Sequence, residues 1–182
     1  RGLRPYDLEN RPLNTQTSFD NGRSGDPKIV QTNGFPNTQT MDSCEVSAYR
    51  ALYMWKQAHS NQDEAIVNLC QELYREDPGS RPVPDSHIRQ TLPVLREDPN
   101  RGRALVLEAD GQVVGYALLV TLWSNELGGE VLFIDEIYVK PSHRGRGHST
   151  ALIQDLLGPS AVWPKKWAAL QLEVSPSNTR AK

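Results

Sequence analysis

Two histidines, two arginines and two glycines gather within positions 143–149, in the stretch His-Arg-Gly-Arg-Gly-His-Ser. Glycine allows left-handed turns and lets a ligand come close to the backbone, because it has no Cβ atom. Arg144 and Arg146 add fixed positive charge, and the first N–H groups of a following helix would have no partner inside it. Residues 144–149, called the glycine loop below, therefore indicate a site for phosphate or pyrophosphate.

The surroundings of the glycine loop favour this interpretation over a solvated basic helix start in which the glycines only make the turn. An apolar run, residues 130–140, precedes the loop and is typical of a buried strand, and the apolar run 149–157 follows it as a helix. Other phosphate-binding loops fit less well. A GxxxxGK[ST] motif is absent, and Thr150 stands where a dinucleotide fingerprint has its third glycine.

Two carboxylates, Asp135 and Glu136, interrupt the apolar strand just before the loop. Strict alternation would place Asp135 with Phe133, Ile137 and Val139 on one face, and Glu136 with Ile134 and Tyr138 on the other. A carboxylate among apolar neighbours has a raised pKa, which suits a general base. Alternatively, one carboxylate pairs with an arginine or points to water. We place Glu136 ahead of Asp135 as the candidate base.

Composition excludes several other classes of function. The chain has 20 Lys and Arg against 22 Asp and Glu, so general electrostatic capture of nucleic acid or membrane is not expected. Cys44 and Cys70 lack a CxxC spacing, and His143 and His148 stand five apart, so no metal site is expected. Apolar runs are too short for a membrane span and no signal-peptide core is visible, which predicts a cytoplasmic protein.

The pattern of the remaining chain predicts a mixed α/β domain. We expect a first strand near 46–51, a helix over 61–76 and a weaker helix over 85–95 that Pro93 interrupts. The Asp110-Gly111 pair joins two apolar runs, 103–109 and 112–123, as a β-hairpin. The strand before the glycine loop, the helix after it and a last strand within 167–176 complete the order.

The ends of the chain differ from its middle. Residues 1–43 are rich in Asn, Pro, Thr, Gly and Gln without apolar periodicity, which predicts a poorly structured extension before a single domain over 44–182. The first residue is Arg1 rather than Met, and Met41 is a candidate for the native start. We therefore expect a fragment.

The stretch from 135 to 153 resembles the acetyl-CoA-binding motif of the GNAT superfamily of N-acetyltransferases. That motif is a strand, Val-x-Pro, and then Arg/Gln-x-x-Gly-x-Gly/Ala at the start of a helix. It is matched here by Val139-Lys140-Pro141 and then by Arg144, Gly147 and Ser149, where serine replaces the usual Gly or Ala. A later Asn-x-x-Ala, Asn178 to Ala181, resembles the next motif of the family.

The resemblance implies a GNAT-like fold whose last two strands, with the tyrosine that often protonates the leaving thiolate, lie beyond Lys182. It implies acetyl-CoA as co-substrate, an amine of a small molecule or protein as acceptor, and an acidic residue on the Asp135–Glu136 strand as base. A homodimer is a further expectation. The alternative is a non-catalytic acyl-CoA-binding or regulatory module. The implied acetyl-CoA-binding residues are Ile137, Tyr138, Val139, Arg144, Gly145, Arg146, Gly147, His148, Ser149 and Asn178.

Overall fold

The structure, a computed structural model, describes residues 54–78 and 82–173. Its centre is a five-stranded sheet in the order β1-β2-β3-β4-β5. Neighbouring strands are antiparallel, except that β4 and β5 are parallel. The strands are β1 (Trp55–Gln57), β2 (Gly102–Ala109), β3 (Gln112–Ser124), β4 (Gly129–Val139) and β5 (Ala169–Leu172). This sheet and its helices confirm the mixed α/β class.

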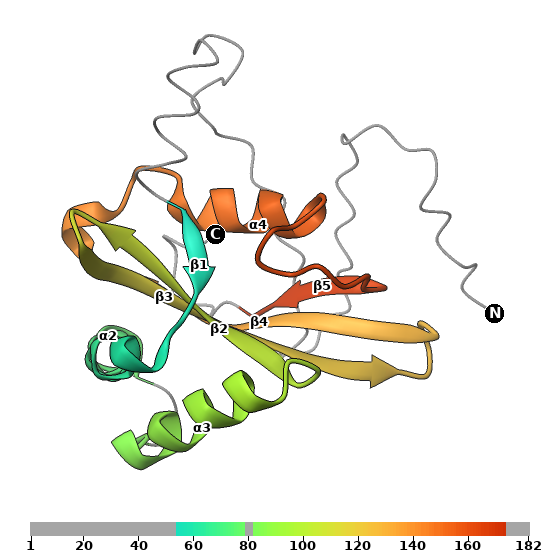
Figure 1. Cartoon of the computed structure of the whole chain (residues 1–182), viewed down its shortest axis with the longest axis horizontal. Coiled ribbons are helices and arrows are strands. Elements are labelled where there is room, and N and C mark those ends of the chain that lie inside the picture. The colour runs from blue at the N-terminus through green and yellow to red at the C-terminus, as the bar shows by residue number, and fades with distance from the viewer. Residues whose placement is uncertain (1–53, 79–81, 174–182) are drawn as a thin grey trace, which may run out of the picture.

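Helices cover both faces of the sheet (Figure 1), with α4 (His148–Leu157) on one side and α2 (Asp63–Glu76) and α3 (Asp85–Glu97) on the other. Each face has its own hydrophobic core. Leu152 and Leu156 of α4 pack with Leu105, Leu119 and Leu132 of the sheet. Ile66 and Leu69 of α2 and Leu92 of α3 pack with Val106, Tyr116 and Leu118. The sheet therefore has two buried faces, which explains why its strands are apolar almost throughout.

Most elements agree with the sequence-based prediction. The helix expected over 61–76 begins as the 3-10 turn η1 (Ser60–Gln62) and continues as α2. The expected hairpin joins β2 to β3 through Asp110 (φ 51°) and Gly111 (φ 74°), the left-handed pair that a two-residue turn of this type requires. The strand predicted over 46–51 lies outside the described residues. No strand was predicted at β1, which is only three residues long.

One prediction about the helices was wrong. Pro93 does not interrupt α3, which continues to Glu97. Proline removes one intrahelical hydrogen bond and crowds the preceding turn. However, the apolar stripe of α3 is held against the sheet on both sides of the proline, through Ile88, Leu92 and Leu95. Burial of that stripe keeps the segment helical, because tertiary packing stabilises a helix more than local propensity does.

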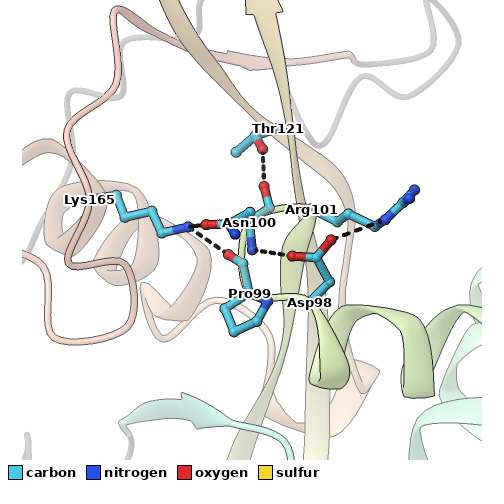
Figure 2. A network of polar contacts seen from close by, with 6 residues as sticks. All are labelled: Asp98, Pro99, Asn100, Arg101, Thr121 and Lys165. Atoms are coloured by element: carbon cyan, nitrogen blue, oxygen red, sulfur yellow. Dashed lines mark hydrogen bonds and ion pairs between the residues drawn. The ribbon is translucent and has the colours of Figure 1, made fainter.

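Side chains from distant segments fix the turn between α3 and β2 (Figure 2). Thr121 on β3 donates its hydroxyl to the Asn100 carbonyl at 2.7 Å. Lys165, from the segment between α4 and β5, donates to the Pro99 carbonyl at 2.9 Å and to Asn100 Oδ1 at 2.6 Å. This turn therefore ties the edge of the α3 layer to the segment that leads into β5.

We expect Pro93→Ala to stabilise the protein by about 1–3 kcal/mol, because it restores a helical N–H group and removes the crowding inside α3. Urea unfolding followed by circular dichroism measures the effect. Pro84→Ala is the matched control, since Pro84 precedes α3 with φ −74° and interrupts no helix. That variant should lose about 0.4–1 kcal/mol through the freer unfolded chain. Equal effects at both positions would contradict the argument.

Candidate active site at the fourth strand and the glycine loop

Strand β4 contains a β-bulge at Asp135. Leu118 of β3 lies opposite Glu136, and Leu119 lies opposite Ile134, so Asp135 has no opposite residue on β3. A bulge inserts one extra residue, and the alternation of side chains changes phase there. The predicted alternation through Asp135 and Glu136 was therefore wrong.

The change of phase decides where Glu136 points. Before the bulge Ile134 belongs to the core on the α4 face, and after it Val139 belongs to that same core. Tyr138 belongs to the core on the opposite face, beneath α2. Glu136 points to the α2 side with Tyr138, as predicted, but not with Ile134.

The bulge also coincides with the end of the contact between β4 and β5. The parallel ladder joins residues 131–134 to residues 169–172, with Ile134 opposite Leu172 as its last pair. Within the described part of the chain, residues 135–139 of β4 have β3 on one side and no strand on the other. A β-strand edge is thus available for pairing directly ahead of the glycine loop.

One backbone hydrogen bond shows which N–H and C=O groups of β4 point away from β3. The Lys140 N–H donates to the Val114 carbonyl on the β3 side at 2.8 Å. Successive residues of a strand direct their N–H and C=O groups to alternate sides, so Ile137 and Val139 direct theirs away from β3. The Val139 carbonyl accepts a hydrogen bond from Arg144 Nε at 2.5 Å. Ile137 and Val139 are hence placed to bond with an extended ligand.

The glycine loop follows a short 3-10 turn, η2 (Pro141–His143), and leads into α4. Gly145 and Gly147 both have φ 76°, a conformation that favours glycine. A Cβ atom added at Gly145 would have no atom within 4 Å, so the backbone is open to a ligand there. The first helical bond of α4 runs from the Ala151 N–H to the Gly147 carbonyl. Ser149 and Thr150 precede that bond, so their N–H groups face the open end of the helix.

The Arg144 side chain connects the loop to α2 rather than extending into solvent. Its guanidinium lies 2.8 Å from Glu76 Oε2 at the end of α2, and its Cζ lies 4.8 Å from the centre of the Tyr138 ring. Tyr138 donates its hydroxyl to Glu76 Oε1 at 2.6 Å. Burial, and then the neighbouring Glu76, raise the pKa of Tyr138. Arg144 therefore fixes the start of the loop to both α2 and β4.

The other polar groups of the loop differ in exposure. His148 is only 4 % exposed, and its carbonyl accepts from Trp55 Nε1 at 2.9 Å. Burial, with Arg146 and His143 nearby, lowers the pKa of His148, so its ring is a neutral packing group at pH 7. Arg146 and Ser149 are exposed. Arg146 is thus a cation at the surface of the loop, and its guanidinium donates to the Ser142 carbonyl at 3.3 Å.

Glu136 lies at the centre of a polar cluster beneath α2. Tyr116 of β3 donates its hydroxyl to Glu136 Oε2 at 2.7 Å, and Tyr74 of α2 donates to Oε1. Cys70 of α2 makes a longer contact from Sγ to Oε2 at 3.7 Å. Both oxygens of the carboxylate therefore have a phenol donor, and the side chain is held in one orientation.

Asp135 differs from Glu136 in every one of these respects. It is exposed at the bulge, and its side chain makes no hydrogen bond with the described residues. Partial desolvation, followed by the like charges of Glu136 and Glu173, raises the pKa of Asp135. The structure thus separates the two candidates: Glu136 is oriented by partners and Asp135 is not.

Comparisons with known proteins place the chain in a family. The model of the Acetyltransferase (GNAT) family matches residues 65–182. A solved integron cassette protein, HFX_CASS3, from the mobile metagenome of Cole Harbour Salt Marsh is 27 % identical with a TM-score of 0.57, covering 66 % of this chain and 76 % of that one. The mixed α/β fold with its five-stranded sheet is shared with that protein. The chain belongs to the GNAT acetyltransferase family.

Two further comparisons are informative. An L-2,4-diaminobutyric acid acetyltransferase of Nocardia farcinica is 34 % identical over 107 residues, which is 59 % of this chain and 52 % of that protein. This chain thus spans about half the length of that curated relative. A Clostridium acetobutylicum acetyltransferase solved with acetyl-CoA shares the fold, with 14 % identity, a TM-score of 0.56, and coverage of 71 % of this chain and 85 % of that one.

Sequence reasoning located the loop but missed the groups that hold it. Tyr116 and Glu76 received no role, because their contacts join residues 20 and 68 positions apart in the chain. A polar residue at a position that should be buried, such as Tyr116 in an apolar strand, is the signal that could have indicated it. Asn178 lies outside the described residues. Among the described residues, no group of three or more His, Cys, Asp or Glu side chains could hold a metal ion.

We expect a double-mutant cycle between Arg144 and Glu76 (Arg144→Gln, Glu76→Gln) to give a coupling free energy of about 0.5–1 kcal/mol in urea unfolding. The pair is partly shielded, with the arginine side chain 19 % exposed and the glutamate 43 %. The control cycle uses Arg101 and Asp98, which are 69 % and 44 % exposed. That cycle should give at most a few tenths of a kcal/mol. A coupling no larger than the control would show that the pair does not fix the loop.

Proposed function

We propose that this chain carries the acetyl-CoA-binding and amine-activating part of an N-acetyltransferase, which acts by direct attack of the amine on the thioester in a ternary complex. The observation that carries the proposal is the open edge of β4 at residues 135–139, which runs directly into the glycine loop. An extended ligand bonded to this edge would bring its far end to the N-terminus of α4. Acetyl-CoA has that form, with an amide-bearing arm and a pyrophosphate.

The residues present fit this co-substrate. Gly145, Gly147 and Ser149 would supply N–H donors to the pyrophosphate, and the exposed Arg146 would supply positive charge. Ile137 and Val139 would bond with the pantetheine amides as an added strand would, while Tyr138 packs beneath them. The remaining residues of the implied set, Arg144 and His148, would act through packing and through the position of the loop. Asn178 stays a prediction.

Acetyl-CoA supplies the reactive thioester, and the protein supplies position and a proton acceptor. The acceptor reaches the site as an ammonium ion, which must lose a proton before its nitrogen can attack the carbonyl carbon. Glu136 would take that proton, directly or through a water molecule. The nitrogen then attacks the carbonyl carbon to form the C–N bond, and the C–S bond breaks as coenzyme A leaves as a thiolate. The nitrogen loses its second proton to solvent, and the thiolate takes up a proton from solvent, so that the products are the amide and the free thiol. Holding the two reactants in the right orientation can lower the activation barrier by up to about 7–11 kcal/mol.

A small primary amine is the acceptor that we propose to test first. The Nocardia farcinica relative is named for a diamino acid, although this chain spans only half of that protein. The charge around the site agrees with a cationic acceptor, because the carboxylate of Asp135 interacts electrostatically with those of Glu136 and Glu173. A lysine side chain or a protein N-terminus would satisfy the same chemistry and belongs in the same panel.

A thiol-release assay with acetyl-CoA and a panel of diamines, amino acids and peptides tests the proposal. Release that depends on one class of amine, with the acetylated product found by mass spectrometry, is the expected result. Tight binding of acetyl-CoA without turnover of any amine would instead favour the non-catalytic acyl-CoA-binding module. Binding of ATP without binding of acetyl-CoA would overturn both.

Location and assembly are predicted from the sequence alone. The described residues include no helix that is long and apolar enough to cross a membrane. A cytoplasmic location, a homodimer, and the absence of nucleic-acid and membrane partners stay predictions.

We expect Gly145→Glu to weaken acetyl-CoA binding at least about tenfold, because it adds a negative charge among the pyrophosphate donors. Gly128→Glu is a closely matched control. Gly128 also has a positive φ (63°) and open space around its Cβ position, but it lies in the turn between β3 and β4. Isothermal titration calorimetry should give the control a native Kd. Equal Kd values for the two variants would show that the pyrophosphate binds elsewhere.

We expect Glu136→Gln to lower kcat by about 10²–10⁴-fold, because the amide cannot accept the amine proton. Asp135→Asn should have a smaller effect, since the exposed Asp135 has no donors that orient it. Glu130→Gln, earlier on the same strand and opposite Trp123, controls for the loss of one charge. Steady-state kinetics at saturating acetyl-CoA measures all three. Near-native kcat for Glu136→Gln would remove Glu136 from the mechanism.

A further inference from the structure

The carboxylate of Glu136 has a phenol donor on each of its two oxygens, and the donors come from different layers of the fold. Tyr116 reaches Oε2 from β3 at 2.7 Å, and Tyr74 reaches Oε1 from α2. Tyr116 has no exposed surface, so its hydroxyl has no access to water and depends on this bond. Tyr74 is only half-buried. One donor is thus rigidly buried, and the other borders the accessible side of the cluster.

Both phenols keep their protons at any pH at which the protein works. Burial, and then Glu136 and Cys70, raise the pKa of Tyr116 far above its ordinary value. Burial, with the bonds to Cys70 and Glu136, raises the pKa of Tyr74 as well. A group with a raised pKa stays protonated as the pH rises, so both tyrosines remain donors. Burial also raises the pKa of the Cys70 thiol, which excludes a thiolate at neutral pH.

The charged groups near Glu136 are themselves carboxylates. Asp135 on the same strand and Glu173 just after β5 interact with one another, and Asp135 interacts with Glu136. Among the described residues, the groups that bond Glu136 are Cys70 and Tyr74 from α2 and Tyr116 from β3. No arginine or lysine of the described ranges bonds Glu136, so neutral donors take the place of a counter-ion there.

We propose that Tyr116 and Tyr74 are positioning residues for Glu136, which hold both oxygens of its carboxylate in one orientation on the α2 side of β4. The proposal rests on the proposed function, in which Glu136 receives the proton of the amine. A carboxylate has about four lone-pair sites, and the two phenols fill one on each oxygen. Lone pairs therefore remain for an ammonium group or for a bridging water molecule.

This arrangement would serve a proton acceptor in two ways. A hydrogen bond to the charged form of a carboxylate favours that form, so the loss of either phenol should make the carboxylate easier to protonate. Fixing both oxygens would also remove the rotation of the side chain, which preserves the alignment between base and amine. A merely structural role, in which the carboxylate only satisfies two buried hydroxyls, would leave the kcat–pH profile unchanged when a phenol is removed.

The test is a ¹³C-NMR titration of the glutamate carboxyl carbons in the wild type, Tyr116→Phe and Tyr74→Phe, with Glu136→Gln to assign the signal. Each Phe variant removes one hydroxyl and keeps the ring. We expect the titration midpoint of Glu136 to move to higher pH by about one unit in each variant, because one donor to the charged form is lost. The acid limb of the kcat–pH profile should move in the same direction.

Tyr138→Phe is the matched control, because it removes a phenol that bonds Glu76 and Glu72 rather than Glu136. Whatever its effect on rate, it should leave the Glu136 midpoint where it is in the wild type. Midpoints in Tyr116→Phe and Tyr74→Phe that equal the control would overturn the proposal. The half-buried Tyr74 gives a readout even where loss of the Tyr116 hydroxyl disturbs the core.

The titration needs no acceptor amine, so it separates this proposal from the proposed function. A shift of the midpoint together with a shift of the kcat limb supports both. A shift of the midpoint in a protein that acetylates no amine supports the carboxylate–phenol interaction and overturns the proposed function. The titration midpoint of Glu136 could move while the acid limb of the kcat–pH profile stays in place. That result would show that Glu136 is not the proton acceptor and would overturn the positioning role.

Discussion

One extra residue in β4 determines most of the architecture around the site. The bulge at Asp135 stands where the ladder between β4 and β5 ends, with Ile134 opposite Leu172 as the last pair. Regular pairing of parallel strands needs an unbroken alternation of N–H and C=O groups, and a bulge increases the local twist of its strand. The same feature therefore ends the pairing with β5 and gives Glu136 its orientation toward α2. An open edge and an inward carboxylate are two consequences of one insertion.

Helix α2 contacts the bulged strand through two parallel rows of side chains. Cys70 and Tyr74 are four residues apart and both contact Glu136. Glu72 and Glu76 are also four apart, and both accept from the Tyr138 hydroxyl. Residues at this spacing lie on one side of a helix, and Glu136 and Tyr138 lie on one face of β4 after the bulge. Slippage of the helix along the strand would break both rows at once, so they fix its register.

The sequence predicted those features that depend on neighbouring residues. The hairpin followed from Asp110-Gly111 between apolar runs, the loop from glycines between a strand and a helix, and α2 from its apolar spacing. Features that depend on distant residues were missed. Alternation could not reveal the bulge, because the extra residue is defined only by the register with Leu118 and Leu119 on β3. Pro93 was misjudged for the same reason, since the burial that keeps α3 helical comes from the sheet.

The candidate site was predictable to a similar degree. Glycine loop residues and the two carboxylates were visible as types and spacings, but the distinction between Asp135 and Glu136 was not. That distinction comes from Tyr74 and Tyr116, which lie 62 and 20 positions from Glu136 in the chain. Arg144 was expected to meet an anion as a loop cation, and the structure instead gives it Glu76 and the ring of Tyr138. A charged side chain can be seen in a sequence, but its partner is chosen by the fold.

The contact between Arg144 and Glu76 joins two helix ends of opposite polarity. Glu76 ends α2, where the helix dipole disfavours negative charge, and the glycine loop starts α4, where the dipole favours it. Arg144 offsets the unfavourable charge of Glu76 at the end of α2. It also holds the loop that forms the start of α4. An anion at the loop would therefore meet the backbone N–H groups together with the exposed Arg146, which also donates to the Ser142 carbonyl. The Glu136 carboxylate lies on the α2 side of β4 and Arg146 lies in the loop that begins α4, so the charges that the proposed amine and the proposed co-substrate require come from different elements.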